Sequence, residues 1–124
     1  MILAENYEPS NNLIDLGALS AAGEFTEVVK LLNEVTGKAY HRFAFQVTVS
    51  GITTNAKVEL QGNIDGGTTF TNLIDGGAQM SLTYDGQFVL EYDTEGLINF
   101  VRLYFASEAG GTAAVLNVKL KVIE

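Results

Sequence analysis

Carboxylates are the most plentiful reactive side chains in this 124-residue sequence, which holds 15 Asp and Glu, one His and no Cys. Asp65, Asp75 and Asp85 each begin an Asp-Gly pair, and they stand ten residues apart. If these three turns met at one end of a domain, their oxygens could bind Ca²⁺. None has the dense Asp spacing of an EF-hand loop, and Asp-Gly is a common turn sequence because Gly adopts positive φ and Asp hydrogen-bonds its own backbone. We therefore predict turns here and no metal site.

Other catalytic groupings need residues that the sequence lacks. Because His41 is the single histidine, neither a multi-histidine metal site nor a Ser-His-Asp triad with a spare base can form. The lack of Cys removes thiolate nucleophiles and iron–sulfur ligands, and no phosphate-binding loop or dinucleotide fingerprint occurs. His41 begins a strongly alternating segment on its apolar side, which favours a structural role. Two carboxylates across a cleft could still hydrolyse a glycosidic bond, but we expect a protein that is not an enzyme and binds no cofactor.

The charge balance limits the kinds of partner. A net charge of −8 repels the phosphate backbone of nucleic acids and the surface of anionic membranes, and the seven Lys and Arg are scattered along the chain. No apolar run reaches the ~18 residues that a membrane-spanning helix needs. We expect neither nucleic acid nor a membrane as a direct partner.

Four segments alternate apolar and polar residues with a period of two, which is the pattern of half-buried antiparallel strands. They cover residues 39–50, 56–64, 87–93 and 113–123. The side chains predicted to point inward are Phe43, Phe45, Val47, Val49, Ala56, Val58, Leu60, Ile64, Phe88, Leu90, Tyr92, Ala114, Leu116, Val118, Leu120 and Val122. Short strands separated by Gly-rich turns predict an all-β fold, a single antiparallel β-sandwich of the jelly-roll or Ig-like Greek-key kind.

The first third of the chain is less regular. Residues 12–19 fit a first strand. Residues 24–35 fit both a helical stripe and a strand, and we predict a strand because several of them are β-branched. Residues 1–12 lack periodicity and contain the only proline, Pro9, which makes a poor central strand. We predict an extended N-terminal arm over residues 1–12, reaching a neighbouring subunit, and a β-sandwich domain over residues 13–124.

Residues 97–106 differ from the other predicted strands because they are apolar on both faces, with Arg102 as their only charge. This pattern indicates a central strand or one whose second face meets another chain. We predict a homo-oligomer, a trimer in the simplest case, in which this second face and the apolar groups of the arm form the interface. The predicted interface residues are Ile2, Leu3, Tyr7, Ile98, Phe100, Arg102 and Tyr104.

The segment from Ala56 to Leu73, AKVELQGNIDGGTTFTNL, resembles a pattern of small β-sandwich proteins from the virions of tailed bacteriophages. In those proteins a V-x-L-x-G-x-x-D-G strand runs through a tight turn into T-x-F/W-x-x-L. The later Phe100-Val101-Arg102-Leu103 is similar to an aromatic-V-R motif of the same domains, and the resemblance covers residues 40–123. It implies a virion structural protein: a capsid decoration or cement protein, or a head-fibre, neck or tail component.

The same resemblance implies where the protein works and what it touches. Such a protein is made in the cytoplasm of the bacterial host and lies on the surface of the phage particle. Its expected partners are the major capsid protein or other virion proteins, which it stabilises through subunit contacts.

A second resemblance points to a different class of function. Galactose-binding-like jelly rolls share an S-x-D-G-x-x-W strand–turn–strand, and here Asn63 and Phe70 replace the Ser and the Trp. Together with several tyrosines, this likeness implies a carbohydrate-binding module. Its sugar contacts would be loop carboxylates with Tyr40, Tyr84 or Tyr104.

Overall fold

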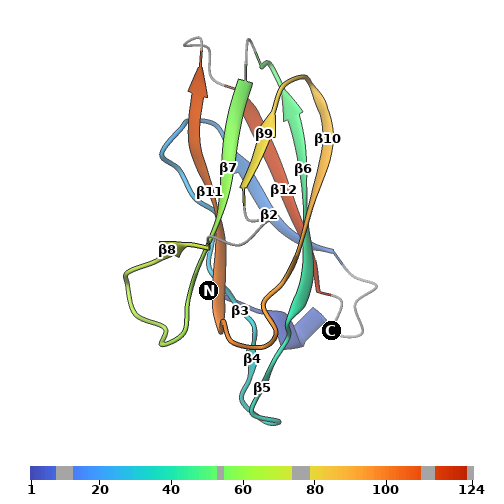
Figure 1. Ribbon diagram of the computed structural model, residues 1–124. Helices are drawn as coiled ribbons and strands as arrows, with labels where there is room; N and C mark the ends of the chain where they lie inside the picture. Colours follow the sequence, from blue (N-terminus) through green and yellow to red (C-terminus); the bar gives the residue numbers. More distant parts are fainter. Residues whose placement is uncertain (8–12, 53–54, 74–78, 110–113, 123–124) are drawn as a thin grey trace.

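The computed structural model describes residues 1–7, 13–52, 55–73, 79–109 and 114–122. They form two β-sheets packed face to face, which confirms the predicted all-β sandwich (Figure 1). The pairings between the described strands are antiparallel except that of β1 with β3. Among the described residues, no helix is long and apolar enough to cross a membrane.

The two sheets are named here A and B. Sheet A has the order β1-β3-β11-β7-β8, with β9 also paired to β7, and sheet B has the order β10-β6-β12-β2. The strands of sheet A are β1 (Ile2–Leu3), β3 (Val29–Lys30), β11 (Phe100–Ala109), β7 (Asn55–Asn63), β8 (Thr71–Asn72) and β9 (Gln79–Leu82). The strands of sheet B are β10 (Gly86–Asp93), β6 (Arg42–Ser50), β12 (Val115–Val122) and β2 (Ile14–Leu19). The chain crosses between the sheets from β6 to β7, β9 to β10, β10 to β11 and β11 to β12, which builds one core between them.

That core follows from the alternation along the long strands. β6 buries every second residue, and β12 does the same where it pairs with β6. Phe43 and Phe45 are fully buried, with their rings edge to face at 5.9 Å between centroids. From sheet A, β11 contributes the fully buried Val101, Leu103 and Phe105. Since each large apolar side chain stabilises the fold by roughly 1.5–3 kcal/mol when fully buried, the inward rows hold the two sheets together.

Two of the less regular segments form strands as predicted. Residues 12–19 contain β2, and residues 24–35 contain β3 and β4 (Leu32–Asn33) without a helix. One inward prediction is wrong, because Ile64 is 64% exposed. It follows the last residue of β7, where the chain turns out of the sheet. The inward position before it is Gly62, at which a Cβ atom would lie only 2.8 Å from Cγ2 of Ile98.

The N-terminal residues do not form an extended arm in their described part, residues 1–7. β1 lies parallel to the edge strand β3, and a 3-10 turn, η1 (Ala4–Tyr7), follows it. Ala4 is 1% exposed, and two further side chains, Ile2 and Tyr7, pack against the core of the same domain. Because Ala4 is buried and Ile2 and Tyr7 are partly buried against their own domain, contacts within one chain order this segment. The remainder of the predicted arm, residues 8–12, lies outside the described residues.

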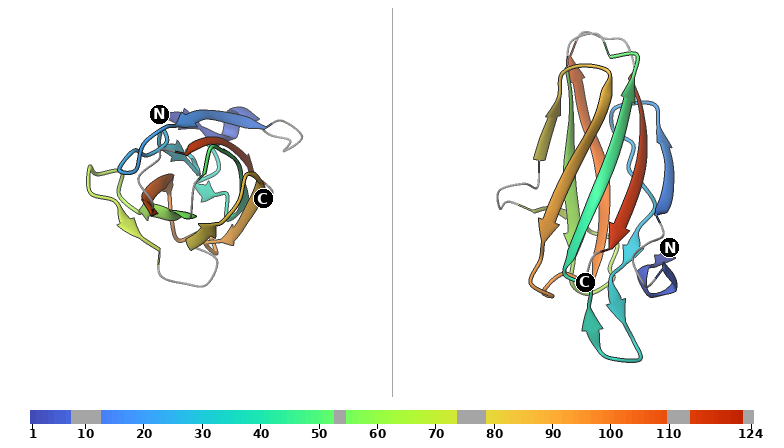
Figure 2. Two further views of the ribbon diagram at one scale, coloured as in Figure 1. Left: turned by 90° about the horizontal axis from the view of Figure 1, so that it is seen from above. Right: turned by 90° about the vertical axis from the view of Figure 1, so that its right-hand side faces the viewer.

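A short hairpin extends beyond one end of the sandwich (Figures 1 and 2). It runs from β4 to β5 (Lys38–Ala39), and we call residues 32–39 the finger. Its tip is fixed by Asn33, whose Oδ1 accepts hydrogen bonds from the backbone N–H of Val35 (2.9 Å) and of Thr36 (3.3 Å). Gly37 closes the turn at φ +72° by donating to the carbonyl of Asn33 (2.8 Å). The finger therefore presents Val35, which is 92% exposed, on a closed turn.

Of the two outer strands of sheet B, β10 and β2, the second is irregular. β2 pairs with β12 through a register shift between Val118 and Lys119, and Gly17 in the middle of β2 has φ +79°. Oδ1 of Asp15 accepts a hydrogen bond from the N–H of Gly17 at 2.9 Å, which holds this bend. β2 is thus a bent edge strand with a bulged pairing.

Candidate functional site

The outward residues of sheet A form the candidate site. Alternation along β11 sends Phe100, Arg102 and Tyr104 outward, as predicted, while Val101, Leu103 and Phe105 fill the core. The register with β7 places Arg102 opposite Gln61, Tyr104 opposite Glu59 and Phe100 opposite Asn63. Polar side chains from β7 thereby lie beside the aromatic and cationic side chains of β11.

Arg102 stands at the centre of this face between two aromatic rings. Its Cζ atom lies 3.9 Å from the ring centroid of Phe25 and 4.4 Å from that of Phe70. Its Nε donates to Oε1 of Gln61 at 2.8 Å, and Nε2 of Gln61 donates to Oδ1 of Asn72 at 3.0 Å. Burial lowers the pKa of Arg102, and the neighbouring Tyr104 opposes that shift. The guanidinium is held by cation–π contacts with both rings and by a hydrogen-bonded chain at Nε.

The first ring reaches Arg102 because the segment before β3 follows the free edge of β11. The N–H of Thr26 donates to the carbonyl of Leu103 (2.9 Å), and the N–H of Leu103 donates back to the Thr26 hydroxyl (3.0 Å). The preceding turn is held by Glu24, whose Oε1 accepts from the N–H groups of Ser20 (2.7 Å) and Ala21 (2.8 Å). These backbone donors lower the pKa of Glu24, so the carboxylate that orders the turn stays ionised.

The second ring reaches Arg102 through the loop between β7 and β8. Asn63 organises this loop, since its Nδ2 donates to the carbonyl of Gly67 (3.0 Å) and its Oδ1 accepts from the N–H of Gly66 (3.2 Å). Gly66 has φ +75°, and a Cβ atom there would lie 3.1 Å from the Phe100 ring. Glycine at this position therefore lets the loop close over Phe100 without backbone strain or a tight Cβ contact.

A shallow groove of about 490 Å³ lies beside the stack. It is lined by Phe70 and Phe100, by the Asp65–Gly67 turn, and by Met1 and Glu27 at its other side. The amino group of Met1 forms an ion pair with Glu27 at 2.6 Å, which fixes the chain start against this groove. The lining of the groove thus combines the two aromatic rings with the carboxylates of Asp65 and Glu27.

The structure separates the seven predicted interface residues. Phe100, Arg102 and Tyr104 lie together on the outer face of sheet A, and Leu3 shares that face, because it is in register with Lys30, which lies opposite Phe100. Ile98 packs against the core beside Gly62, and Ile2, Leu3 and Tyr7 belong to the docked N-terminal segment. The role of all seven in an interface stays a prediction. Sequence reasoning missed Phe25, Phe70 and Gln61, which complete the environment of Arg102.

Asp65 and Asp85, the two Asp-Gly carboxylates that the structure describes, hold separate turns. Asp65 Oδ1 accepts from the N–H of Gly67 (2.9 Å) at one end of the sandwich. Asp85, in the turn at the opposite end, accepts from the N–H groups of Gly51 (3.1 Å) and Ile52 (3.0 Å). These contacts confirm the predicted turn roles of Asp65 and Asp85, and Asp75 lies outside the described residues. Within the part of the chain that the structure describes, no three His, Asp or Glu side chains gather to hold a metal ion.

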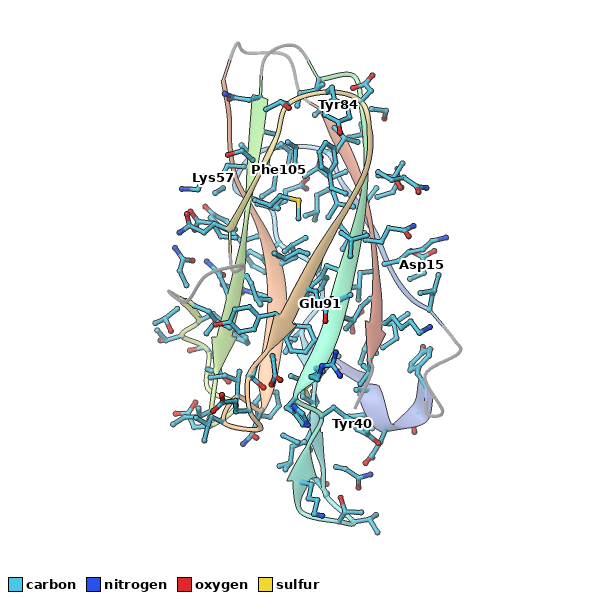
Figure 3. The ribbon with its side chains drawn as sticks, turned by 45° about the vertical axis from the view of Figure 1, so that its right-hand side comes forward. Asp15, Tyr40, Lys57, Tyr84, Glu91 and Phe105 are labelled. Carbon is cyan, nitrogen blue, oxygen red and sulfur yellow. The ribbon has the colours of Figure 1, made fainter. Side chains whose placement is uncertain are left out.

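The tyrosines proposed as sugar contacts lie apart. Figure 3 shows Tyr84 at the end of the sandwich opposite to Tyr40. Tyr84 stacks on Phe88, with 5.0 Å between the ring centroids, and Tyr104 lies on the outer face of sheet A. The three therefore cannot contact one small sugar together.

His41 lies at the lower end of sheet B beside a second, smaller groove of about 320 Å³. Its Nδ1 lies 3.0 Å from Oδ1 of Asp93, one of the residues that line this groove. The N–H of Glu95 donates to the same oxygen at 2.8 Å, and this donor, followed by His41, lowers the pKa of Asp93. His41 is thus one of the partners of the Asp93 carboxylate, at the end of β10.

Comparison with known proteins defines the fold class. No protein-family model and no curated protein matches the sequence. Among solved structures, the SPBc2 prophage-derived protein YomS superposes with a TM-score of 0.54 and 14% identity, over 90% of this chain and 91% of that protein. At that identity the likeness shows a shared β-sandwich fold.

Two further likenesses are weaker. The carbohydrate-binding module CBM36, solved with calcium and xylotriose, has a TM-score of 0.48 and 14% identity over 89% of this chain and 87% of that chain. A chain of the human norovirus GI.7 Houston strain VLP has a TM-score of 0.46 and 14% identity, and the match spans 91% of this chain but 31% of the viral one.

Proposed function

We propose that this protein is a non-enzymatic structural component of a virion, in the simplest case a phage capsid decoration or cement protein. It stabilises the particle through subunit contacts on the particle surface. The sequence pattern from Ala56 to Leu73 supports the proposal, and the β-sandwich fold, shared with a prophage-derived protein, is compatible with it.

The observation that carries the proposal is the outer face of sheet A. Phe25, Phe70 and Phe100 surround Arg102 there, and Phe25 remains 52% exposed. Aromatic residues and arginine are the residue types most enriched at the centres of protein interfaces. Because loops and hydrogen bonds already hold these side chains in place, little conformational entropy remains to be lost when a partner binds.

The direct test asks whether the protein is part of the particle. Virions released from the bacterium that carries the gene would be purified by density gradient and their proteins quantified by mass spectrometry, with the major capsid protein as internal standard. We expect the protein at a fixed ratio to the major capsid protein, and we expect particles from a gene deletion to lose their genome more readily on heating. Wild-type particles without the protein would contradict the proposal.

The groove beside the Arg102 stack favours one alternative function, binding of carbohydrate. Its volume of about 490 Å³ lies in the range of small-ligand sites, and it combines two aromatic rings with the carboxylate of Asp65. A glycan array probed with and without Ca²⁺ tests this function. Binding that is lost in Phe70→Ala and retained in Tyr84→Ala, at the far end, would support it, and no binding in either condition would remove it.

A further inference from the structure

Three other cationic groups of sheet A have an ion-pair partner within the chain, whereas Arg102 has none among the described residues. Lys30 pairs with Glu34, Lys57 pairs with Glu59 at 3.3 Å, and the N-terminal amino group pairs with Glu27. Among the residues that the structure describes, no carboxylate lies within ion-pair distance of Arg102. In a chain with 15 acidic and seven basic residues, a partly buried guanidinium without an anion indicates that its counter-charge comes from another molecule.

The surroundings of Arg102 leave one direction for that anion. The guanidinium carbon of Arg102 lies over the rings of Phe25 and Phe70, and Gln61 occupies Nε. The edge that carries the two Nη groups has no hydrogen-bond partner among the described residues. Such an edge binds a planar carboxylate through two parallel hydrogen bonds. Phe70 also lines the apolar groove, so the matching ligand is a carboxylate with an apolar group beside it.

The finger of this same chain presents that combination. The Glu34 side chain is 70% exposed although it pairs with Lys30, and the adjacent Val35 is 92% exposed. Asn33 holds both on a closed turn, so the tip needs no ordering before it binds. The finger extends past the body of the sandwich, where it can contact another copy (Figure 2).

We propose that the finger tip of one copy docks on the outer face of sheet A of a second copy. Glu34 binds the free edge of Arg102, so that one carboxylate lies between Lys30 of its own chain and the guanidinium of the partner. Val35 enters the groove beside Phe70 and Phe100. Since two different surfaces meet, the contact is reciprocated across a two-fold axis, repeated around a closed ring, or continued as an open filament. This inference deepens the proposed function, because it names the subunit contact that the function requires.

Charge reversal tests the contact. The mass of the wild-type protein would be measured by light scattering over a range of concentrations, together with Glu34→Arg, Arg102→Glu and the double variant. Lys121→Glu on sheet B is the matched control, because it changes the net charge by the same amount as Arg102→Glu. We expect a concentration-dependent oligomer that each single reversal weakens about tenfold or more, partial recovery in the double variant, and no change in the control. A monomeric wild type, or an oligomer that survives both single reversals, would overturn the proposal.

Engineered cysteines give a second readout that leaves the Arg102 stack intact. Because the chain has no native Cys, every disulfide between two variants is assignable. A Val35→Cys protein would be mixed in a glutathione buffer with Glu27→Cys, which lies on the groove, or with Tyr84→Cys at the opposite end as the control. We expect the mixed 35–27 dimer in excess over 35–84, since a disulfide requires Cα atoms within about 7 Å. Equal yields would overturn the contact.

The outcomes separate this contact from the proposed function. If the protein is present in purified virions while Glu34→Arg associates as the wild type does, the function stands and the finger contact is wrong. If the charge and cysteine tests succeed while virions lack the protein, the contact stands and the virion role is wrong. Thermal unfolding of each variant shows that it is folded, and the exposed position of Glu34 keeps that variant informative if Arg102→Glu fails to fold.

Discussion

The outer faces of both sheets carry ion pairs, but among the described residues only the outer face of sheet A also carries aromatic rings around a guanidinium. On sheet B, Arg42 pairs with Glu91 at 3.3 Å, and Lys119 lies opposite Asp15 in the register. Figure 3 shows Asp15 of sheet B and Lys57 of sheet A on opposite sides of the sandwich. One side is thus a solvated polar surface, and the other combines apolar and cationic groups in the manner of an interface.

The difference arises from the connections rather than from the strands. Both sheets obey the same alternation, and β6 is paired with β10 and β12 along almost all of its length. On sheet A, by contrast, the segment before β3 and the loop between β7 and β8 lie over the face and bring in Phe25 and Phe70. Two sheets with one shared core can therefore acquire different surfaces through their loops, where binding residues commonly reside.

The largest expected loss of stability comes from two core substitutions, which test whether sheets A and B share one core. Phe45→Ala on sheet B and Phe105→Ala on sheet A each remove a fully buried ring. We expect both to lower the free energy of unfolding by about 3–5 kcal/mol, because each leaves a cavity in the same core. Urea unfolding measures both values. A loss confined to one variant would mean that the sheets are stabilised separately.

The next effect isolates the close approach of a loop to sheet A. Gly66→Ala places a Cβ atom against the Phe100 ring at φ +75°, whereas Gly17→Ala on sheet B meets nothing within 4 Å at φ +79°. The backbone strain alone costs about 1–2 kcal/mol in both, and the clash adds to it in Gly66→Ala. We expect the greater destabilisation in Gly66→Ala by thermal unfolding. Equal values would show that the loop moves away from Phe100 without cost.

A smaller effect compares one cation on each face. Arg102→Ala removes two stacking contacts and the hydrogen bond to Gln61, and we expect a loss of about 1–2 kcal/mol. Lys121→Ala on the solvated face of sheet B should change stability by no more than about 0.5 kcal/mol. Chemical unfolding at high salt serves as a further check, because stacking on rings persists when surface ion pairs are screened. If Arg102→Ala and Lys121→Ala lowered the free energy of unfolding equally, Arg102 would contribute no more to stability than a cation on the solvated face of sheet B.

The smallest effect concerns two exposed carboxylates, Asp93 at the end of β10 and Glu24 before β3. Backbone N–H donors lower the pKa of each in the folded protein, with His41 adding to the effect on Asp93. A lowered folded pKa stabilises the fold above the ordinary carboxyl pKa of about 4 and loses that contribution as the pH falls through the folded value. We expect the stability difference between wild type and Asp93→Asn to shrink as the pH falls below about 4. Carboxyl NMR titration checks both pKa values, and values at or above the ordinary range would contradict the hydrogen bonds.

Most of the strands could be predicted because alternation is a local property. The inward rows of β6, β10 and β12 follow from the residue types alone, and the outward positions of Phe100, Arg102 and Tyr104 follow from their parity. The alternation predicts Ile64 to point inward because a periodic pattern does not show where a strand ends, and β7 ends one residue before it. The chain leaves the sheet after Asn63, whose side chain organises the next turn.

The site was predictable only in part, because its components come from distant segments. Hydrogen bonds between the irregular segment before β3 and β11 bring Phe25 to Arg102. Such a long-range contact leaves no periodic pattern in the sequence. The T-x-F pattern after the Asp65 turn marks Phe70 as a special position, but it does not show that the ring lies on Arg102. The docking of residues 1–7 was missed for a similar reason, since the free edge of β3 that receives them belongs to a long-range pairing.

The bent edge of β2 has a consequence for how copies of this protein are kept from joining. A straight, flat edge strand can act as a template on which further chains add as strands, a route to fibres that grows worse as concentration rises. The positive φ of Gly17 and the register shift opposite it interrupt the row of backbone groups that such templating requires. At this edge, chains crowded together in an assembly are thereby steered away from adding as further strands, and recognition there is left to side chains that single substitutions can tune.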